Sequence, residues 1–148
     1  MRYLGLDLGS RRLGISISDA NGIIATSYKT IHHKEDYSLL IEEIGEIIQK
    51  EQIEIIVLGF PKNMDNSIGE KGELSIHFKS LLEEKYKYIP VFLQDERLTT
   101  REAQSILIQN KTSRKKRKNV VDQIAAVIIL QSYLDKKEGE KNESRIGE

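Results

Sequence analysis

The sequence predicts one α/β domain built on a mixed, five-stranded sheet with helices packed on both faces. Three observations carry this prediction. Strand-like segments open the chain at 3–8, 14–18 and 23–31. Apolar helices then alternate with apolar strands, and a meander followed by helix–strand units is the element order of a mixed sheet. The length of 148 residues is sufficient for one domain with a full core.

The first strand carries a lone carboxylate, Asp7, near its end. A buried, unpaired carboxylate is unfavourable, so an apolar strand that holds one either pairs the charge or uses it. Gly9 and Gly14 bracket the following turn, which contains Arg11 and Arg12. Such a turn suits a metal ion or a phosphate. It also suits a hairpin in which the aspartate hydrogen-bonds its own turn.

The next segments follow from their apolar periodicity. Asn21-Gly22 is typical of a two-residue hairpin between the second and third strands. Leucine and isoleucine recur at three- and four-residue steps over 37–52, which predicts an amphipathic helix. Segment 53–60 is almost continuously apolar and β-branched, which predicts a central parallel strand. A polar loop rich in glycine, asparagine and serine is expected over 61–72.

The second half of the chain repeats this alternation. We expect a helix over 73–86 and a strand over 90–94. A Thr-x-x-Glu capping box opens a further helix over 99–109. Segment 110–118 contains no apolar residue and is expected to be a basic break. The strongly apolar segment 120–134 then predicts the last helix.

The remaining sequence bounds the class of protein. Residues 1–135 form the predicted domain, and residues 136–148 are charged and low in complexity, which predicts a disordered tail. The 23 basic and 23 acidic side chains cancel, so a nucleic-acid ligand needs a local basic patch. The absence of cysteine excludes disulfides and agrees with a cytoplasmic protein. No apolar run approaches the roughly 18 residues of a membrane span.

The histidines give little support to a metal site. His32 and His33 are adjacent, and adjacent residues of an extended chain point to opposite sides. A solvated loop is therefore the favoured interpretation. His77 lies within the helix predicted over 73–86 and is expected at its surface.

Three acidic positions stand out because apolar sequence surrounds them. Asp7 ends the first strand, Glu96 or its neighbour Asp95 follows the strand over 90–94, and Asp122 lies in the first turn of the last helix. Sites in open α/β sheets form beyond the carboxyl ends of the parallel strands. The helix face that carries Asp122 is otherwise apolar and should pack on the sheet; it consists of Ala125, Ala126, Ile129 and Tyr133.

Three carboxylates that meet at one edge would repel one another unless a cation neutralises them. Oxygen ligands favour Mg²⁺ or Mn²⁺, and two such ions about 4 Å apart can support phosphodiester cleavage by activating a water and stabilising the leaving oxygen. Each carboxylate also has a structural interpretation: Asp7 caps its turn, Glu96 pairs with Arg97 or Arg12, and Asp122 favours a helix N-terminus. Spacing alone leaves both interpretations open.

The motifs, taken in order, resemble the YqgF-type family of Holliday-junction-resolvase-like nucleases. The matching stretches are DLGSRRLG at 7–14, LGFPKNMD at 58–65, DERLTT at 95–100, and SRKKRK at 113–118 leading into DQIAA and LQSYL. The resemblance implies a ribonuclease-H-like fold and a cytoplasmic nuclease that matures the 5′ end of pre-16S ribosomal RNA. It implies that the acidic positions of the family are Asp7, Glu96 and Asp122.

A basic run immediately precedes the helix that bears Asp122. Phosphates held by that run would be delivered to the carboxylates, and a solubilising loop is the alternative. The loop around Asn63 could close over a substrate. Aromatic residues are few and scattered, so no platform for stacking unpaired bases is evident. The expected nucleic-acid contacts are Arg12, Asn63, Arg97, Thr99, Thr100, Arg114, Lys115, Lys116, Arg117 and Lys118.

The substrate and the assembly stay open at this point. Precursor ribosomal RNA and branched DNA are both compatible with the residues. A junction resolvase would need a homodimer to cut two strands, whereas an RNA nuclease could be a monomer. Two other classes compete with a nuclease. One is a sugar-kinase-like ATPase, whose phosphate loop is similar but which closes two related domains. The other is a non-catalytic nucleic-acid-binding module of the same fold.

Overall fold

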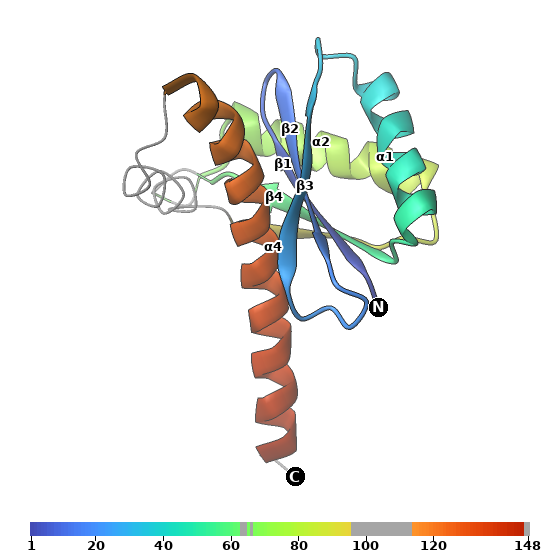
Figure 1. Cartoon of the computed structure of the whole chain (residues 1–148), viewed down its shortest axis with the longest axis vertical. Helices are drawn as coiled ribbons and strands as arrows, with labels where there is room; N and C mark the ends of the chain where they lie inside the picture. Colours follow the sequence, from blue (N-terminus) through green and yellow to red (C-terminus); the bar gives the residue numbers. More distant parts are fainter. Residues whose placement is uncertain (63–64, 66, 96–113, 147–148) are drawn as a thin grey trace.

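A computed structural model gives the fold of the chain (Figure 1). It describes residues 1–62, 65, 67–95 and 114–146, with side chains of the last range described over 124–140. Eight elements follow one another in this part of the chain: β1 (Tyr3–Leu8), β2 (Arg12–Ser18), β3 (Ala25–His32), α1 (Tyr37–Glu51), β4 (Ile55–Phe60), α2 (Glu70–Lys85), β5 (Val91–Asp95) and α4 (Arg114–Ile146).

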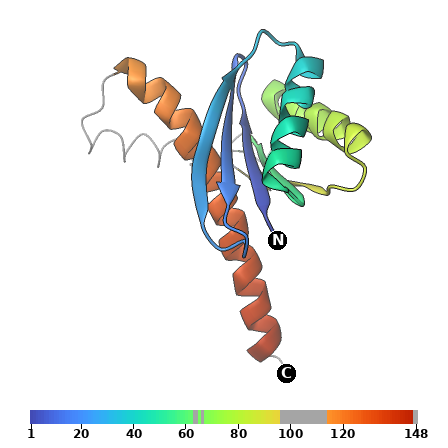
Figure 2. The same cartoon turned by 45° about the vertical axis from the view of Figure 1, so that its right-hand side comes forward.

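The strands form one mixed, five-stranded sheet in the order β3-β2-β1-β4-β5. β1 and β2 are antiparallel, as are β2 and β3, whereas β1, β4 and β5 run parallel to one another. The carboxyl ends of β1, β4 and β5 therefore lie at one edge of the sheet. α1 and α2 cover one face and α4 covers the other, which confirms the predicted architecture (Figure 2).

Strand alternation divides the apolar residues between two cores. Leu4 and Leu6 of β1 belong to the larger cluster, together with Ile44 of α1 and Phe78 of α2. Tyr3 belongs to the second cluster. That cluster joins the opposite sheet face to α4 and consists of Tyr3, Ala25, Ile55, Val57, Ile129, Leu130, Tyr133 and Leu134. Odd-numbered residues of β1 thus face α4.

α4 approaches β1 closely at Gly5. A Cβ built on Gly5 would contact Ser16 Oγ and would lie 2.8 Å from Leu130 Cβ and 3.1 Å from the carbonyl oxygen of Ala126. The Ser16 hydroxyl donates a hydrogen bond of 2.7 Å to the same Ala126 carbonyl oxygen. Gly5, Ser16 and Ala126 are all buried, so small residues on both elements set the spacing of helix and sheet.

The β2–β3 connection differs from the predicted two-residue turn. It spans residues 19–24, and β3 begins only at Ala25. Asp19 Oδ1 accepts the backbone N–H of Ile23 at 2.7 Å and of Ile24 at 2.9 Å. The hydrogen bonds from Ile24 and then Ile23 also lower the pKa of the Asp19 carboxyl. This carboxylate therefore offers the two amides an alternative to the strand ladder.

The bounds of two helices also differ from the prediction. α2 begins at Glu70 rather than 73, with Glu70 and Glu73 in its first turn, where carboxylates favour the helix dipole. α4 begins at Arg114 rather than 120, so the predicted basic break is wrong over 114–118. Lysine and arginine are good helix formers, and no proline interrupts the segment.

α4 also continues to Ile146, well beyond the predicted end at 134. Residues 135–140 are exposed, and the helix projects past the sheet there (Figure 1). The division between a domain over 1–135 and a tail over 136–148 stays a prediction. No helix in the part of the chain that the structure describes is long and apolar enough to cross a membrane.

We expect Gly5→Ala to lower the free energy of unfolding by about 1–3 kcal/mol, because the added methyl group overpacks the contact between β1 and α4. Urea unfolding followed by circular dichroism measures the change. Gly139→Ala is the matched control, since its Cβ would meet no heavy atom of the described residues within 4 Å. That change in a helix should be stabilising by up to about 1 kcal/mol. Equal effects of the two substitutions would contradict the close approach.

Candidate functional site

Asp7 is the predicted site residue that the structure describes most fully. It is the penultimate residue of β1, it pairs with Gly14 of β2, and it is half-buried. It lies two residues after Gly5, so its side chain is on the sheet face that α4 covers. Asp7 therefore stands at the edge where the parallel strands end, beside the start of the Gly9–Arg12 turn.

The register of β5 on β4 shows on which side of the sheet Asp95 lies. Asp95 pairs with Phe60 of β4, and the Phe60 ring would lie 3.3 Å from a Cβ on Gly72 of α2. Phe60 and Asp95 therefore share the α2 face, away from Asp7. Phe92 has the opposite orientation, since its ring stacks on Tyr133 of α4. Gln94 shares that face by alternation.

The other predicted residues are described in part or not at all. Asp122 lies within α4, four residues before Ala126, and its side chain is outside the described residues. Arg12 is half-buried at the start of β2, opposite His32 of β3. Five predicted phosphate contacts, Arg114, Lys115, Lys116, Arg117 and Lys118, lie in the first turns of α4. The residues outside the described ranges are Asn63, Glu96, Arg97, Thr99 and Thr100.

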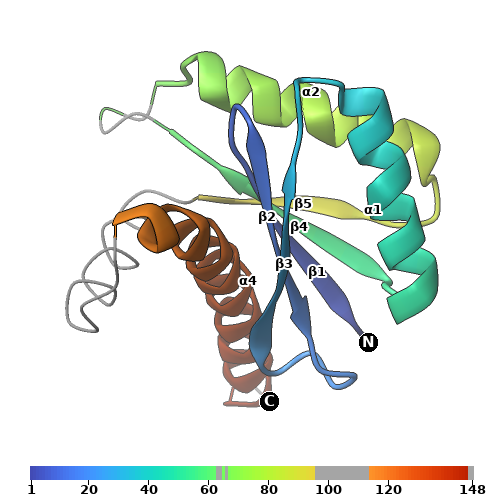
Figure 3. The same ribbon diagram turned by 45° about the horizontal axis from the view of Figure 1, so that its top comes forward.

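Because the side chains of Glu96 and Asp122 lie outside the described residues, the meeting of the three predicted carboxylates stays a prediction. Within the described side chains, no group of three histidine, aspartate or glutamate residues is placed to hold a metal ion. The strand directions are nevertheless as predicted. In Figure 3, β4 and β5 run toward the side of the molecule on which α4 begins.

The turn that follows Asp7 is held by hydrogen bonds from two directions. Within the turn, the Gly9 N–H donates to the carbonyl oxygen of Arg12 at 2.7 Å. From β3, the His33 N–H donates to the carbonyl oxygen of Arg11 at 2.9 Å. The His33 ring completes the clamp, because its Nε2 lies 3.0 Å from the carbonyl oxygen of Gly9.

The tautomer of His33 follows from its second ring nitrogen. Nδ1 accepts the backbone N–H of Glu35 at 3.1 Å, so Nε2 carries the proton and donates to Gly9. The ring also packs on Tyr37, with centroids 5.8 Å apart, and Tyr37 meets the buried Phe78 edge-on at 6.1 Å. A continuous aromatic chain thus connects the core to the turn.

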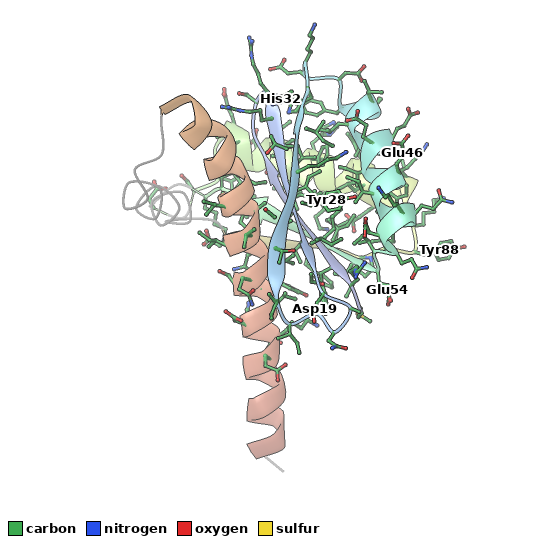
Figure 4. All side chains as sticks on the ribbon, viewed as in Figure 1. Asp19, Tyr28, His32, Glu46, Glu54 and Tyr88 are labelled. Carbon is green, nitrogen blue, oxygen red and sulfur yellow. The ribbon has the colours of Figure 1, made fainter. Side chains whose placement is uncertain are left out.

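His33 is the residue that sequence reasoning missed. The neighbouring His32 is exposed and lies at the upper end of the sheet in Figure 4, as a loop histidine should. His33 instead is half-buried and hydrogen-bonded. The available signal was the register of β2 and β3, which pairs Arg12 with His32 and so places the next residue at the turn. That register depends on the length of the β2–β3 connection. His77 is exposed on α2, as predicted.

A family model described as "RuvX: Holliday junction resolvase" matches residues 1–136. The chain belongs to the RuvX family. This confirms the resemblance to the YqgF-type family. A protein of Geobacillus sp. (strain WCH70) is 48% identical over 141 residues, which cover 93% of this chain and 100% of that protein. A protein of Bacillus subtilis (strain 168) is 49% identical over 138 residues, which cover 91% of this chain and 98% of that protein. Both carry the name "Putative pre-16S rRNA nuclease".

Solved structures confirm the fold of this RuvX-family chain. RuvC of T. thermophilus in complex with a Holliday junction substrate superposes with a TM-score of 0.60. The match covers 94% of this chain and 96% of RuvC at 13% sequence identity. A second structure of T. thermophilus RuvC gives a TM-score of 0.56. At this identity the likeness shows the ribonuclease-H-like fold alone.

We expect His33→Ala to loosen the turn after Asp7. Loss of the bond to the Gly9 carbonyl oxygen removes about 1 kcal/mol, which should speed hydrogen exchange of the Gly9 amide about fivefold. Exchange is measured by NMR on labelled protein. His32→Ala, on the exposed neighbour, is the matched control and should leave the Gly9 amide unchanged. The clamp does not exist if the two variants behave alike.

Proposed function

We propose that this RuvX-family chain is a metal-dependent nuclease that hydrolyses phosphodiester bonds in the maturation of the 5′ end of pre-16S ribosomal RNA. The observation that carries the proposal is the register of α4 on β1. Tyr3 packs against Tyr133, with ring centroids 6.0 Å apart, and Gly5 faces Leu130 and Ala126. A step of two residues along β1 toward the sheet edge, from Tyr3 to Gly5, thus corresponds to a step toward the N-terminus of α4.

The next step along β1 leads to the site. Two strand residues span about 6.6 Å, and four to five helix residues span about 6–7.5 Å. Asp7 follows Gly5 by two residues, so the corresponding turn of α4 is the one that contains Asp122. The register therefore supports a meeting of Asp7 and Asp122, which the sequence alone could propose only from a shared sheet edge.

Strand alternation supports Glu96 as the third carboxylate. Phe92 and Gln94 lie on the α4 face, whereas Asp95 lies on the α2 face. If the alternation of β5 continues for one residue, Glu96 is on the same face as Asp7. We therefore assign the site to Asp7, Glu96 and Asp122 and exclude Asp95 from it.

The donor chemistry fits a hard divalent cation. All three proposed ligands are carboxylates, the chain has no cysteine, and oxygen ligands favour Mg²⁺ or Mn²⁺. Such an ion, when bound, supplies water activation and charge neutralisation for phosphodiester hydrolysis. The protein then has to position the strand. Arg12 stands at the clamped turn. The basic residues over 114–118 precede Asp122 by four to eight helix residues, or about 6–12 Å.

We assign the other strand contacts to Asn63, Arg97, Thr99 and Thr100, because they adjoin the ends of β4 and β5 in the sequence. The names of the relatives support ribosomal RNA as substrate, and the description of the family supports branched DNA as the alternative. Membership in this family favours a nuclease over an ATPase. A cytoplasmic monomer is sufficient for RNA cleavage, whereas a resolvase would act as a homodimer.

We expect Asp7→Asn, Glu96→Gln and Asp122→Asn each to lower the rate of cleavage at least about a hundredfold, because each loses a charge that holds the cation. Asp95→Asn is the matched control and should retain the wild-type rate. The assay follows cleavage of precursor 16S ribosomal RNA, and of a four-way DNA junction, with Mn²⁺. Cleavage by Asp7→Asn at the wild-type rate would mean that the domain is a binding module or uses another site.

Metal binding has a readout that is independent of activity. An ion that binds only the folded protein at 100 times its Kd adds about 2.7 kcal/mol, which should raise the Tm by about 5–10 °C for a domain of this size. Thermal unfolding with and without Mn²⁺ measures the shift. Asp7→Asn should lose the shift and Asp95→Asn should keep it. An equal shift in both variants places the ion elsewhere.

A further inference from the structure

Phe92 and Tyr133 form an aromatic pair whose outer ring is open to solvent. Phe92 belongs to β5, yet 40% of it is exposed. Tyr133 of α4 is buried, with only 8% of it exposed. The two rings are nearly parallel, with an interplanar angle of 23° and centroids 5.7 Å apart. Tyr133 in turn packs on Tyr3 of β1. The Phe92 ring is therefore fixed from one side and available from outside.

A cation accompanies the pair. Lys137 Nζ lies 6.0 Å from the centroid of Phe92 and 6.0 Å from that of Tyr133. Lys137 is exposed on α4, one turn after Tyr133. Burial, then Tyr3 and Glu140, raise the pKa of the Tyr133 hydroxyl.

We propose that Phe92 is a stacking site for an unpaired base of a single-stranded RNA, with Lys137 contacting a neighbouring phosphate. An exposed aromatic face beside a cation is the combination that binds single-stranded nucleic acids. The inference rests on the proposed function, because the strand that reaches Phe92 is the strand that Asp7 would cut. It reverses the expectation that the few aromatic residues of this chain form no platform.

The position on the sheet sets the distance to the scissile phosphate. Phe92 pairs with Val57 of β4, and Val57 pairs with Gly5 of β1. Phe92 is thus two strands away from β1 and level with Gly5, which precedes Asp7 by two residues along β1. With strands about 4.8 Å apart and a rise of about 3.3 Å per residue, the two backbones are separated by about 12 Å. The stacked base should therefore be about two nucleotides from the cleaved bond.

The test measures binding without cleavage. Full-length protein is titrated in EDTA with a fluorescent single-stranded RNA of ten nucleotides, and with the same sequence as a duplex. Phe92→Leu keeps the apolar bulk and removes the aromatic face. It should weaken single-strand binding about tenfold, since stacking is worth about 1–3 kcal/mol per base, and leave duplex binding unchanged. Unchanged single-strand affinity overturns the proposal, as does an equal loss for both ligands.

A second variant keeps the test informative whatever the stability of Phe92→Leu. The chain has no tryptophan, so Phe92→Trp introduces a single reporter at the proposed site. This variant should bind within about twofold of wild type, and the RNA should quench its emission. Lys137→Gln should lower the slope of log affinity against log salt by about 0.7 for a single strand. Emission that the RNA does not change overturns the proposal.

Two outcomes separate this inference from its alternatives. If Phe92→Leu changes the mass of the free protein in light scattering, the ring belongs to an interface between copies and the proposal fails. If Phe92→Leu binds RNA normally while Asp7→Asn abolishes cleavage, only the stacking site is wrong. The reverse result, weak binding by Phe92→Leu with cleavage by Asp7→Asn intact, leaves the stacking site in place and removes the carboxylate site.

Discussion

The contact of α4 with β1 at Gly5 is the constraint on which the rest of the molecule depends. With no side chain at Gly5, the helix comes close enough for Ser16 to donate a hydrogen bond to the carbonyl oxygen of Ala126. That bond, together with the packing of Leu130 and Ala126 against Gly5, sets the position of the helix along its axis. The contact therefore also sets where Tyr133 lies, on the C-terminal side of it in α4, and where residue 122 lies, on its N-terminal side. A slide of one turn, about 5.4 Å, would move α4 out of step with the end of β1.

The sheet edge adds a second, independent brace. His33 holds the turn after Asp7 through two carbonyl oxygens, and Tyr37 and Phe78 connect that ring to the core. In the proposed site, convergent carboxylates would repel one another before a cation binds, so the backbone that carries them would have to resist displacement. Strand register, helix packing and the hydrogen bonds of His33 hold that backbone in place. None of these contacts uses the side chain of a proposed metal ligand.

Local sequence patterns predicted the strands, their directions and the apolar face of α4, because burial imposes a period of two or of about four residues on each. They failed where tertiary or competing polar contacts decide the outcome. Asp19 draws the amides of Ile23 and Ile24 away from a two-residue turn. Lysine-rich segments carry both a helix propensity and a solvated character, so neither end of α4 could be placed from composition.

The candidate site shows the same division. Asp7, Asp122 and either Asp95 or Glu96 were identifiable as charges within apolar sequence, and the family resemblance pointed to Glu96. The β4–β5 register adds an independent argument for Glu96, because it pairs Asp95 with Phe60. The pairing of Phe92 with Tyr133 joins residues 41 positions apart in the chain. No local pattern encodes such a contact, so it became visible only in the folded molecule.

The most direct test of the central claim is a crystal structure of the chain grown with Mn²⁺, with data collected at a wavelength where manganese scatters anomalously. The claim predicts an anomalous peak at the sheet edge with carboxylate oxygens of Asp7, Glu96 and Asp122 within about 2.0–2.3 Å of it. A peak at another place, or carboxylates that face separate surfaces with no ion between them, would contradict it.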